Sequence, residues 1–112
     1  MYIINETEKE YRNGTSGPKY LMKGMRMNFG VILLQPGESM SPHYHQVMEE
    51  NFFVAEGEAE IKVNDKIYPL KTGDFVHCEP SERHALGNPG EKPARIFFMM
   101  SPYMDADKVE CE

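Results

Sequence analysis

The apolar residues of this sequence occur in short segments, each closed within a few residues by glycine, proline, asparagine or aspartate, and this pattern constrains the fold most. None of the segments carries the sustained 3.6-residue apolar period of an amphipathic helix. Residues 58–63 instead alternate between apolar and charged, and Asn64-Asp65 then predicts a tight hairpin turn before residues 67–70. Further strands are expected at residues 25–34, 51–55, 75–78 and 94–100. About eight to ten short strands without intervening helices predict an all-β fold, either a sandwich or a barrel such as a jelly roll.

The length of 112 residues is that of one domain. Residues 2–5 are apolar enough to form a first strand, whereas residues 6–18 are polar and are expected to form a loop. We therefore expect an N-terminal strand and loop at residues 1–24 and a β domain at residues 25–104. An acidic tail at residues 105–112 is expected to be a solvated end.

The charge balance is acidic, with 18 Asp and Glu against 12 Lys and Arg and a formal net charge of −6. Such a surface repels phosphate backbones, so we expect no nucleic-acid partner. The longest apolar runs, residues 31–34 and 96–100, are far shorter than the roughly 20 residues that span a bilayer, so we expect no membrane partner either. The acidic N-terminus does not resemble a signal peptide, and a cytoplasmic protein is expected.

Two cysteines, Cys78 and Cys111, are too few for a disulfide framework. Cys78 lies in an apolar, strand-like stretch and is expected to pack as a small buried hydrophobic residue.

The histidines carry the chemical signal. His43 and His45 are two residues apart, so on a strand both rings point to the same side. A turn at residues 46–49 would bring Glu50 back beside them, and His84 follows in a later turn. Three imidazoles and one carboxylate suit a divalent Mn, Fe, Co, Ni, Zn or Cu ion, and the lack of thiolate argues against structural zinc. Four protein ligands on an ion that prefers six leave two positions for water or substrate, which is typical of a catalytic site.

The spacing around these residues resembles the first motif of the cupin superfamily, which here comprises Gly37, His43, His45, Glu50 and Gly57. In the second motif Gly73, His84 and Asn88 match, whereas Glu79 and Ser81 stand where the family has proline and glycine. The resemblance covers about residues 25–100 and implies a double-stranded β-helix, or jelly roll.

By position, the resemblance also implies His43, His45, Glu50 and His84 as metal ligands. Glu49 is the rival for Glu50, and strand alternation allows only one of the two to face the metal. Small cupins commonly form homodimers, sometimes with strand exchange, and the apolar N-terminal segment is compatible with that.

Two classes of function remain open. The first is a metal-dependent enzyme acting on a small organic substrate: a dioxygenase with iron, or an isomerase, lyase or decarboxylase with manganese, nickel or zinc. The second is a binding protein that holds a metal and a small ligand without turnover, because fold does not fix function. A metal-free epimerase-like cupin is a weaker third option, since it would not need all four ligands. The roles of five further residues are left open: Arg26, Tyr44, His77, Glu79 and Arg95.

Overall fold

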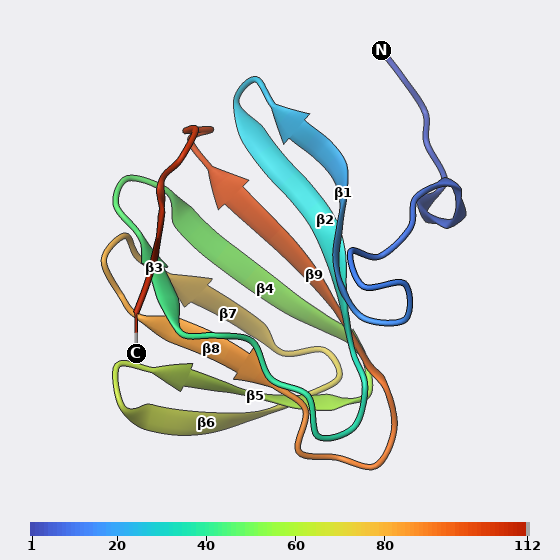
Figure 1. Cartoon of the computed structure of the whole chain (residues 1–112), viewed down its shortest axis with the longest axis vertical. Coiled ribbons are helices and arrows are strands. Elements are labelled where there is room, and N and C mark those ends of the chain that lie inside the picture. Colours follow the sequence, from blue (N-terminus) through green and yellow to red (C-terminus); the bar gives the residue numbers. More distant parts are fainter. Residues whose placement is uncertain (112) are drawn as a thin grey trace.

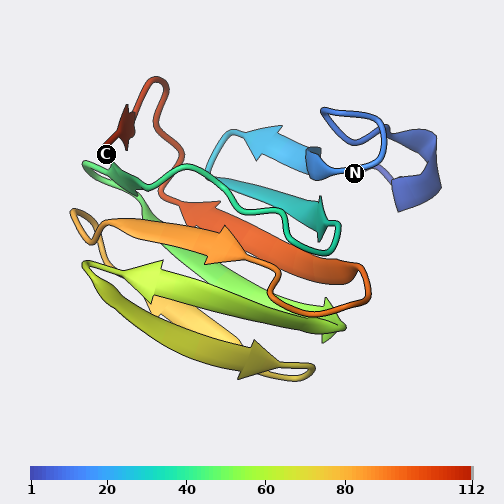
Figure 2. The ribbon, with the colours of Figure 1, turned by 60° about the horizontal axis from the view of Figure 1, so that its bottom comes forward.

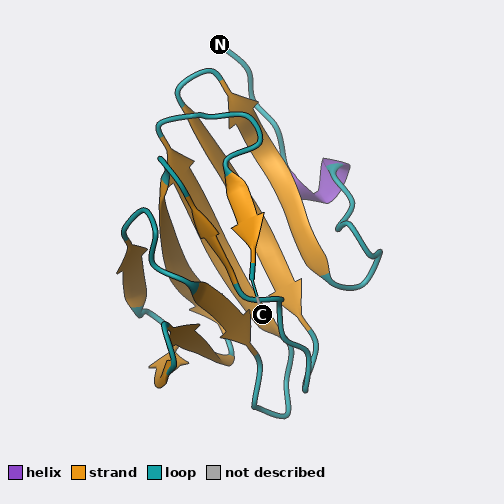
Figure 3. Cartoon of the chain, turned by 60° about the vertical axis from the view of Figure 1, so that its left-hand side comes forward, coloured by secondary structure: helices purple, strands orange, loops and turns teal. Residues whose placement is uncertain are grey.

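The computed structural model describes residues 1–111, and nearly all of its regular structure is β (Figure 1, Figure 3). Two five-stranded antiparallel sheets, ordered β1-β2-β9-β4-β7 and β10-β3-β8-β5-β6, form the domain. The expected all-β jelly roll is thereby confirmed. The strands run over β1 (Gly17–Gly24), β2 (Met27–Leu34), β3 (His43–His45), β4 (Glu49–Glu56), β5 (Glu58–Val63), β6 (Lys66–Lys71), β7 (Phe75–Cys78), β8 (His84–Gly87), β9 (Ala94–Ser101) and β10 (Lys108–Glu110).

From β2 onward the chain crosses repeatedly between the two sheets, and only β5 and β6 follow one another within a sheet. Figure 2 shows the resulting layers, with β8, β5 and β6 in front of β9 and β4. The hairpin of β5 and β6 has the expected turn, since Val63 pairs with Lys66 across Asn64-Asp65. Asn64 has a φ of 51°, a left-handed conformation that asparagine tolerates better than most residues.

The core lies between the sheets and follows from strand alternation. Along β9 every second residue is buried, and the inward side chains of β2, β4, β5 and β8 meet it. Cys78 belongs to this core, as expected. Its buried hydrophobic members are Ile32, Leu34, Met48, Phe52, Val54, Ala59, Ile61, Cys78, Leu86, Ala94, Ile96, Phe98 and Met100.

Asn88 of the second motif supports this core rather than the site. Its buried amide donates to the carbonyls of Leu34 at 3.0 Å and Lys92 at 2.8 Å and accepts from the Gly90 amide at 2.9 Å. It therefore fixes the loop that leads from β8 to β9.

The predicted strand at residues 2–5 is wrong. Asn5 instead caps a short 3₁₀ helix, η1 (Glu6–Glu8), through a capping box with Glu8. The Glu6 side chain pairs with Lys19 at 3.2 Å and with Arg95, which places η1 against the outer side of the sheet beside β1 (Figure 1). These polar interactions, rather than strand pairing, hold the N-terminal segment.

Two edge strands lie outside the expected domain range of 25–104. Strand β1 pairs with β2 even though it contains Gly17-Pro18, because an edge strand tolerates a proline that cannot donate to the ladder. Strand β10 pairs with β3, so the acidic C-terminal segment is not simply a solvated end. Within residues 1–111, no helix is long and apolar enough to cross a membrane.

Gly30 on β2 has no room for a side chain, and this gives a test of the packing. A Cβ at this position would lie 2.2 Å from the Lys19 carbonyl oxygen and 2.6 Å from the Phe98 ring. We expect Gly30→Ala to lower the free energy of unfolding by about 3 kcal/mol, because neither the neighbouring backbone nor the buried ring can move without cost. Urea denaturation measures the effect.

The matched control is Gly87→Ala on β8, where the nearest atom would be the Ser39 Cβ at 3.5 Å. This variant is expected to lose about 1 kcal/mol or less. Equal losses for the two variants would contradict the packing described here.

Candidate metal centre

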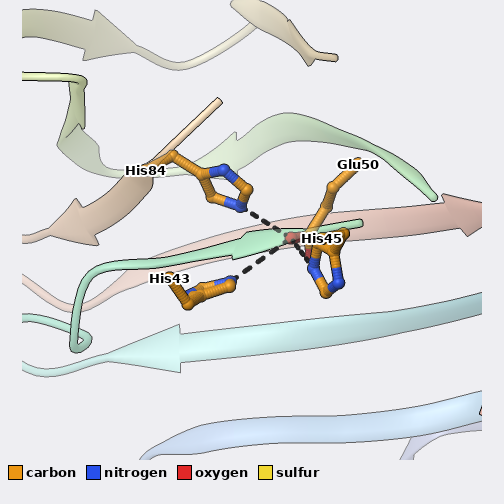
Figure 4. A group of neighbouring side chains, drawn as sticks. All are labelled: His43, His45, Glu50 and His84. Carbon is orange, nitrogen blue, oxygen red and sulfur yellow. Dashed lines mark hydrogen bonds and ion pairs between the residues drawn. The ribbon is translucent and has the colours of Figure 1, made fainter. Parts of the chain in front are cut away.

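The four residues singled out by spacing come from three strands. His43 and His45 lie on β3, His84 pairs with His43 from the neighbouring β8, and Glu50 lies on β4 in the opposite sheet. Since both histidines of β3 point toward β4, the four side chains meet between the sheets (Figure 4). All four are buried, each exposing 5% or less of its surface.

Their potential ligand atoms all lie within 4.8 Å of one another. The Nε2 atoms of His43, His45 and His84 lie 3.6, 3.0 and 2.9 Å from the same oxygen, Oε1 of Glu50. Glu49 points to the other side of the sheet, where its carboxylate lies 3.3 Å from Nδ1 of His77. Strand alternation therefore places Glu50, and not its rival, at the cluster.

Backbone carbonyls orient two of the three imidazoles. Nδ1 of His43 lies 3.0 Å from the Ser41 carbonyl oxygen, and Nδ1 of His84 lies 3.0 Å from that of Glu82. A carbonyl only accepts, so each Nδ1 carries a proton, and a ring in its neutral form would turn the lone pair of Nε2 toward Glu50. Nδ1 of His45 is buried without a hydrogen-bond partner among residues 1–111.

Glu50 is ionised in this setting. Burial raises its pKa, but hydrogen bonds from the three histidines and the charge of His84 outweigh burial and hold the pKa well below its ordinary value. If His43 or His84 were neutral, the lone pair of its Nε2 would face the Glu50 carboxylate, and two hydrogen-bond acceptors would repel each other. Either a second proton on those rings or a cation between the four groups relieves this repulsion. A divalent ion relieves it while the imidazoles stay neutral, which is the form that binds metals.

Three residues of the cluster, His43, His45 and Glu50, line a cavity of about 110 Å³. Five apolar residues and the polar residues Arg12, Tyr20 and Lys108 complete its lining. These three residues could not be singled out from the sequence, because Arg12 and Tyr20 fall in the segment expected to be an N-terminal strand and loop and Lys108 falls in the expected solvated tail. The other lining residues, besides the ligands, are Pro18, Ile32, Met40, Phe98 and Met100.

The residues whose roles were open lie elsewhere. His77 bonds to Asn51 at 2.6 Å and Glu79 at 3.0 Å outside the barrel, and Arg95 pairs with Glu6 and Glu56 on the outer face of its sheet. Arg26 is exposed in the turn between β1 and β2, and Tyr44 is half-buried on β3, between the two histidines in sequence. None of these five lines the cavity.

Asp107 orders the loop between His45 and Glu49. Its buried carboxylate accepts from the amide of Val47 at 3.0 Å and that of Met48 at 2.8 Å, and its carbonyl accepts from Gln46 at 3.1 Å. The C-terminal segment thus fixes the turn that brings Glu50 back to the histidines.

A family model described as Cupin domain matches residues 30–100. Among curated proteins, Protein SchB of Streptomyces halstedii is 37% identical over 73 residues, covering 65% of this chain and 53% of that protein. Tetracenomycin polyketide synthase protein TcmJ of Streptomyces glaucescens is 34% identical, over 65% of this chain and 49% of its own. This chain thus spans about half the length of these relatives.

Among solved structures, an uncharacterised conserved protein with a double-stranded β-helix domain from Klebsiella pneumoniae superposes with a TM-score of 0.86. The two are 24% identical, and the match covers 100% of this chain and 98% of that one. It supports the fold.

The hydrogen bonds of Asp107 give a test of this loop. We expect Asp107→Ala to lower the free energy of unfolding by about 2 to 3 kcal/mol, because it leaves the Val47 and Met48 amides without an acceptor. Amide hydrogen exchange at these two residues should rise as well. Asp65→Ala is the control, since the exposed Asp65 side chain forms no hydrogen bond or ion pair within residues 1–111. Unchanged exchange at Val47 and Met48 in the Asp107 variant would contradict the proposed role of the carboxylate.

Proposed function

The chain belongs to the cupin family, and we propose that it is a metal-dependent enzyme that acts on a small organic substrate. His43, His45, Glu50 and His84 would hold one divalent transition-metal ion, of Mn, Fe, Co, Ni, Zn or Cu. The observation that carries this proposal is the convergence of three imidazole nitrogens on one buried carboxylate oxygen, with two rings held by backbone carbonyls in the tautomer that binds metal.

The donor set fits such an ion. Three neutral nitrogens and one carboxylate leave a divalent ion with a net positive charge and with positions free for a substrate. When bound, the ion would supply Lewis-acid activation of a substrate oxygen or, for iron, redox chemistry.

The chain's own residues would bind the substrate and exclude water. Ile32, Phe98 and Met100 form an apolar wall beside the ligands, and a substrate held against it displaces solvent from the cluster. The Tyr20 hydroxyl on the same cavity can hydrogen-bond a substrate oxygen. Binding and orientation are therefore provided by β1, β2 and β9, and the ligands by β3, β4 and β8.

The substrate class is drawn from this lining and from the relatives. The names of TcmJ and of CurC from Streptomyces cyaneus contain polyketide synthase. A cavity lined by both apolar and polar residues suits the partly apolar, oxygen-rich molecules of that class. We propose a dioxygenase, isomerase, lyase or decarboxylase reaction on a small molecule of this kind.

Metal content tests the site. Protein purified without chelator is expected to contain close to one transition-metal ion per chain, measured by elemental analysis. His84→Ala should lower the affinity for that metal by at least about tenfold, because it removes a ligand and leaves Glu50 less compensated. His77→Ala is the matched control, a histidine outside the barrel whose loss should leave metal content unchanged. Equal metal content in His84→Ala and the wild type would refute the proposed ligand set.

Turnover separates an enzyme from a protein that only binds. Oxygen uptake and product formation would be measured with aromatic β-dicarbonyl, sugar-acid and thiol substrates. Activity that is lost in His84→Ala and kept in His77→Ala supports the enzyme. Saturable binding without turnover across this series would favour the non-catalytic alternative.

The outer face of the sheet of β2, β9, β4 and β7 supports a homodimer, which we also propose. Five apolar side chains gather there around a shallow cavity of about 100 Å³, with Phe75 on the free edge strand 62% exposed. An uncharged patch on a molecule of net charge −6 can pair with its own copy where acidic surfaces would repel. The five apolar residues of the face are Phe29, Phe53, Phe75, Phe97 and Met99.

Exchange of the N-terminal segment between two copies is a further proposal, since Met1, Tyr2 and Ile3 are exposed.

Phe75→Ser is expected to weaken this dimer by about tenfold or more, because it removes the most exposed of the five apolar side chains from the proposed contact. Analytical ultracentrifugation over a concentration series measures the change. Ile67→Ser is the control, since Ile67 is also exposed, at 55%, but lies on β6 in the other sheet. A wild-type protein that stays monomeric at high micromolar concentration would rule the dimer out.

A further inference from the structure

Two basic side chains line the cavity in a protein whose net charge is −6. Arg12, from the loop before β1, and Lys108, from β10, both line the cavity that contains the histidines. The same two residues line a second cavity of about 260 Å³ that adjoins the first and shares Pro18 and Met40 with it. A molecule entering through this second cavity would therefore pass both cations.

The other charged groups around this entrance already have partners. Lys108 pairs with Glu110 at 3.1 Å, and the Glu38 carboxylate accepts from the Gln35 backbone amide at 2.6 Å. For Arg12, no carboxylate lies within ion-pair distance in the part of the chain that the structure describes, residues 1–111. Arg12 is thus a cation without a carboxylate partner at this entrance, whereas Glu38 keeps its negative charge.

The loop that carries Arg12 is held in place by its own backbone. The Arg12 amide donates to the Pro18 carbonyl at 2.9 Å, and the Asn13 amide donates to that of Ser16 at 3.0 Å. Gly17 turns the chain into β1 with a φ of +88°, where a side chain would be strained. Arg12 is therefore presented from an ordered turn, which lowers the entropy lost when its guanidinium binds a ligand.

Arg12 acts together with Tyr20, which lines the same cavity. Burial raises the pKa of Tyr20, while the Arg12 guanidinium lowers it and Glu50 raises it, so the hydroxyl is within electrostatic reach of both. Tyr20 stays protonated at neutral pH and can donate a hydrogen bond to an anion beside Arg12.

We propose that the cavity binds a small organic carboxylate, whose anionic group is held by the Arg12 guanidinium and the Tyr20 hydroxyl. The apolar part of this molecule lies inward, against Ile32, Phe98 and Met100. A planar guanidinium matches a carboxylate with two parallel hydrogen bonds, whereas a phosphate dianion would leave one negative charge without a partner. The inference rests on the proposed function, because it names the substrate class for the same site.

The test uses benzoate as the probe, with benzamide as its neutral analogue and phenyl phosphate as the dianion. Each is titrated by calorimetry into protein purified without chelator, and metal content is measured on the same samples. We expect benzoate to bind the wild type more tightly than benzamide or phenyl phosphate does. Arg12→Gln should weaken benzoate binding by about tenfold or more, and Tyr20→Phe should weaken it to a smaller extent.

Arg26→Gln is the matched control, because it removes the same charge from an exposed turn away from the cavity. Its benzoate affinity should stay within about twofold of the wild type. Equal affinity for benzoate in Arg12→Gln and the wild type would overturn the proposal, as would benzamide or phenyl phosphate binding at least as tightly as benzoate.

Metal content distinguishes this inference from the proposed function. If metal-containing protein fails to bind benzoate, the carboxylate proposal is wrong and the proposed metal site is unaffected. If metal-free protein binds benzoate in an Arg12-dependent way, the proposed metal site is wrong and the carboxylate proposal is supported. Arg12→Gln should keep the metal content of the wild type, because Arg12 is not among the ligands.

Discussion

The burial of the Glu50 carboxylate is the interaction on which the rest of this structure depends. A charge between two β-sheets is costly unless hydrogen bonds or opposite charge compensate it. Here the compensation comes from three imidazoles on β3 and β8, in the sheet opposite to the strand that carries Glu50. The two sheets therefore contact each other through a polar centre as well as through the apolar core. The position of that centre requires β3, β4 and β8 to keep their positions relative to one another.

Much of this centre could be predicted from the sequence because the relevant signals are local. Two histidines two residues apart on a strand share a side whatever the tertiary structure, and alternation separates Glu49 from Glu50. The hairpin of β5 and β6 was equally accessible, since alternating residues flank a turn that asparagine favours. The resemblance of the two motifs to the cupin family supplied the grouping of His84 with His43 and His45, which no local pattern contains.

The segments that sequence reasoning placed incorrectly are those whose structure depends on distant partners. Strand β1 begins with Gly17-Pro18, a pair typical of turns, so only its pairing with β2 makes it a strand. Strand β10 has three residues, and the neighbouring Asp107 is buried only because the loop after β3 offers it amide donors. Arg12 was missed for the same reason, since nothing in its own sequence places it at a cavity formed by strands far along the chain.

The carbonyls that orient His43 and His84 have a consequence for how such sites diverge among homologues. The oxygens belong to the main chain at Ser41 and Glu82, so the orienting group itself does not depend on the side chain at either position. Position 41 is therefore free to drift without loosening the imidazole of His43. At position 82 the carboxylate also accepts from the Glu79 amide at 2.8 Å, so the side chain there helps to keep the path of the backbone that has to be inherited unchanged.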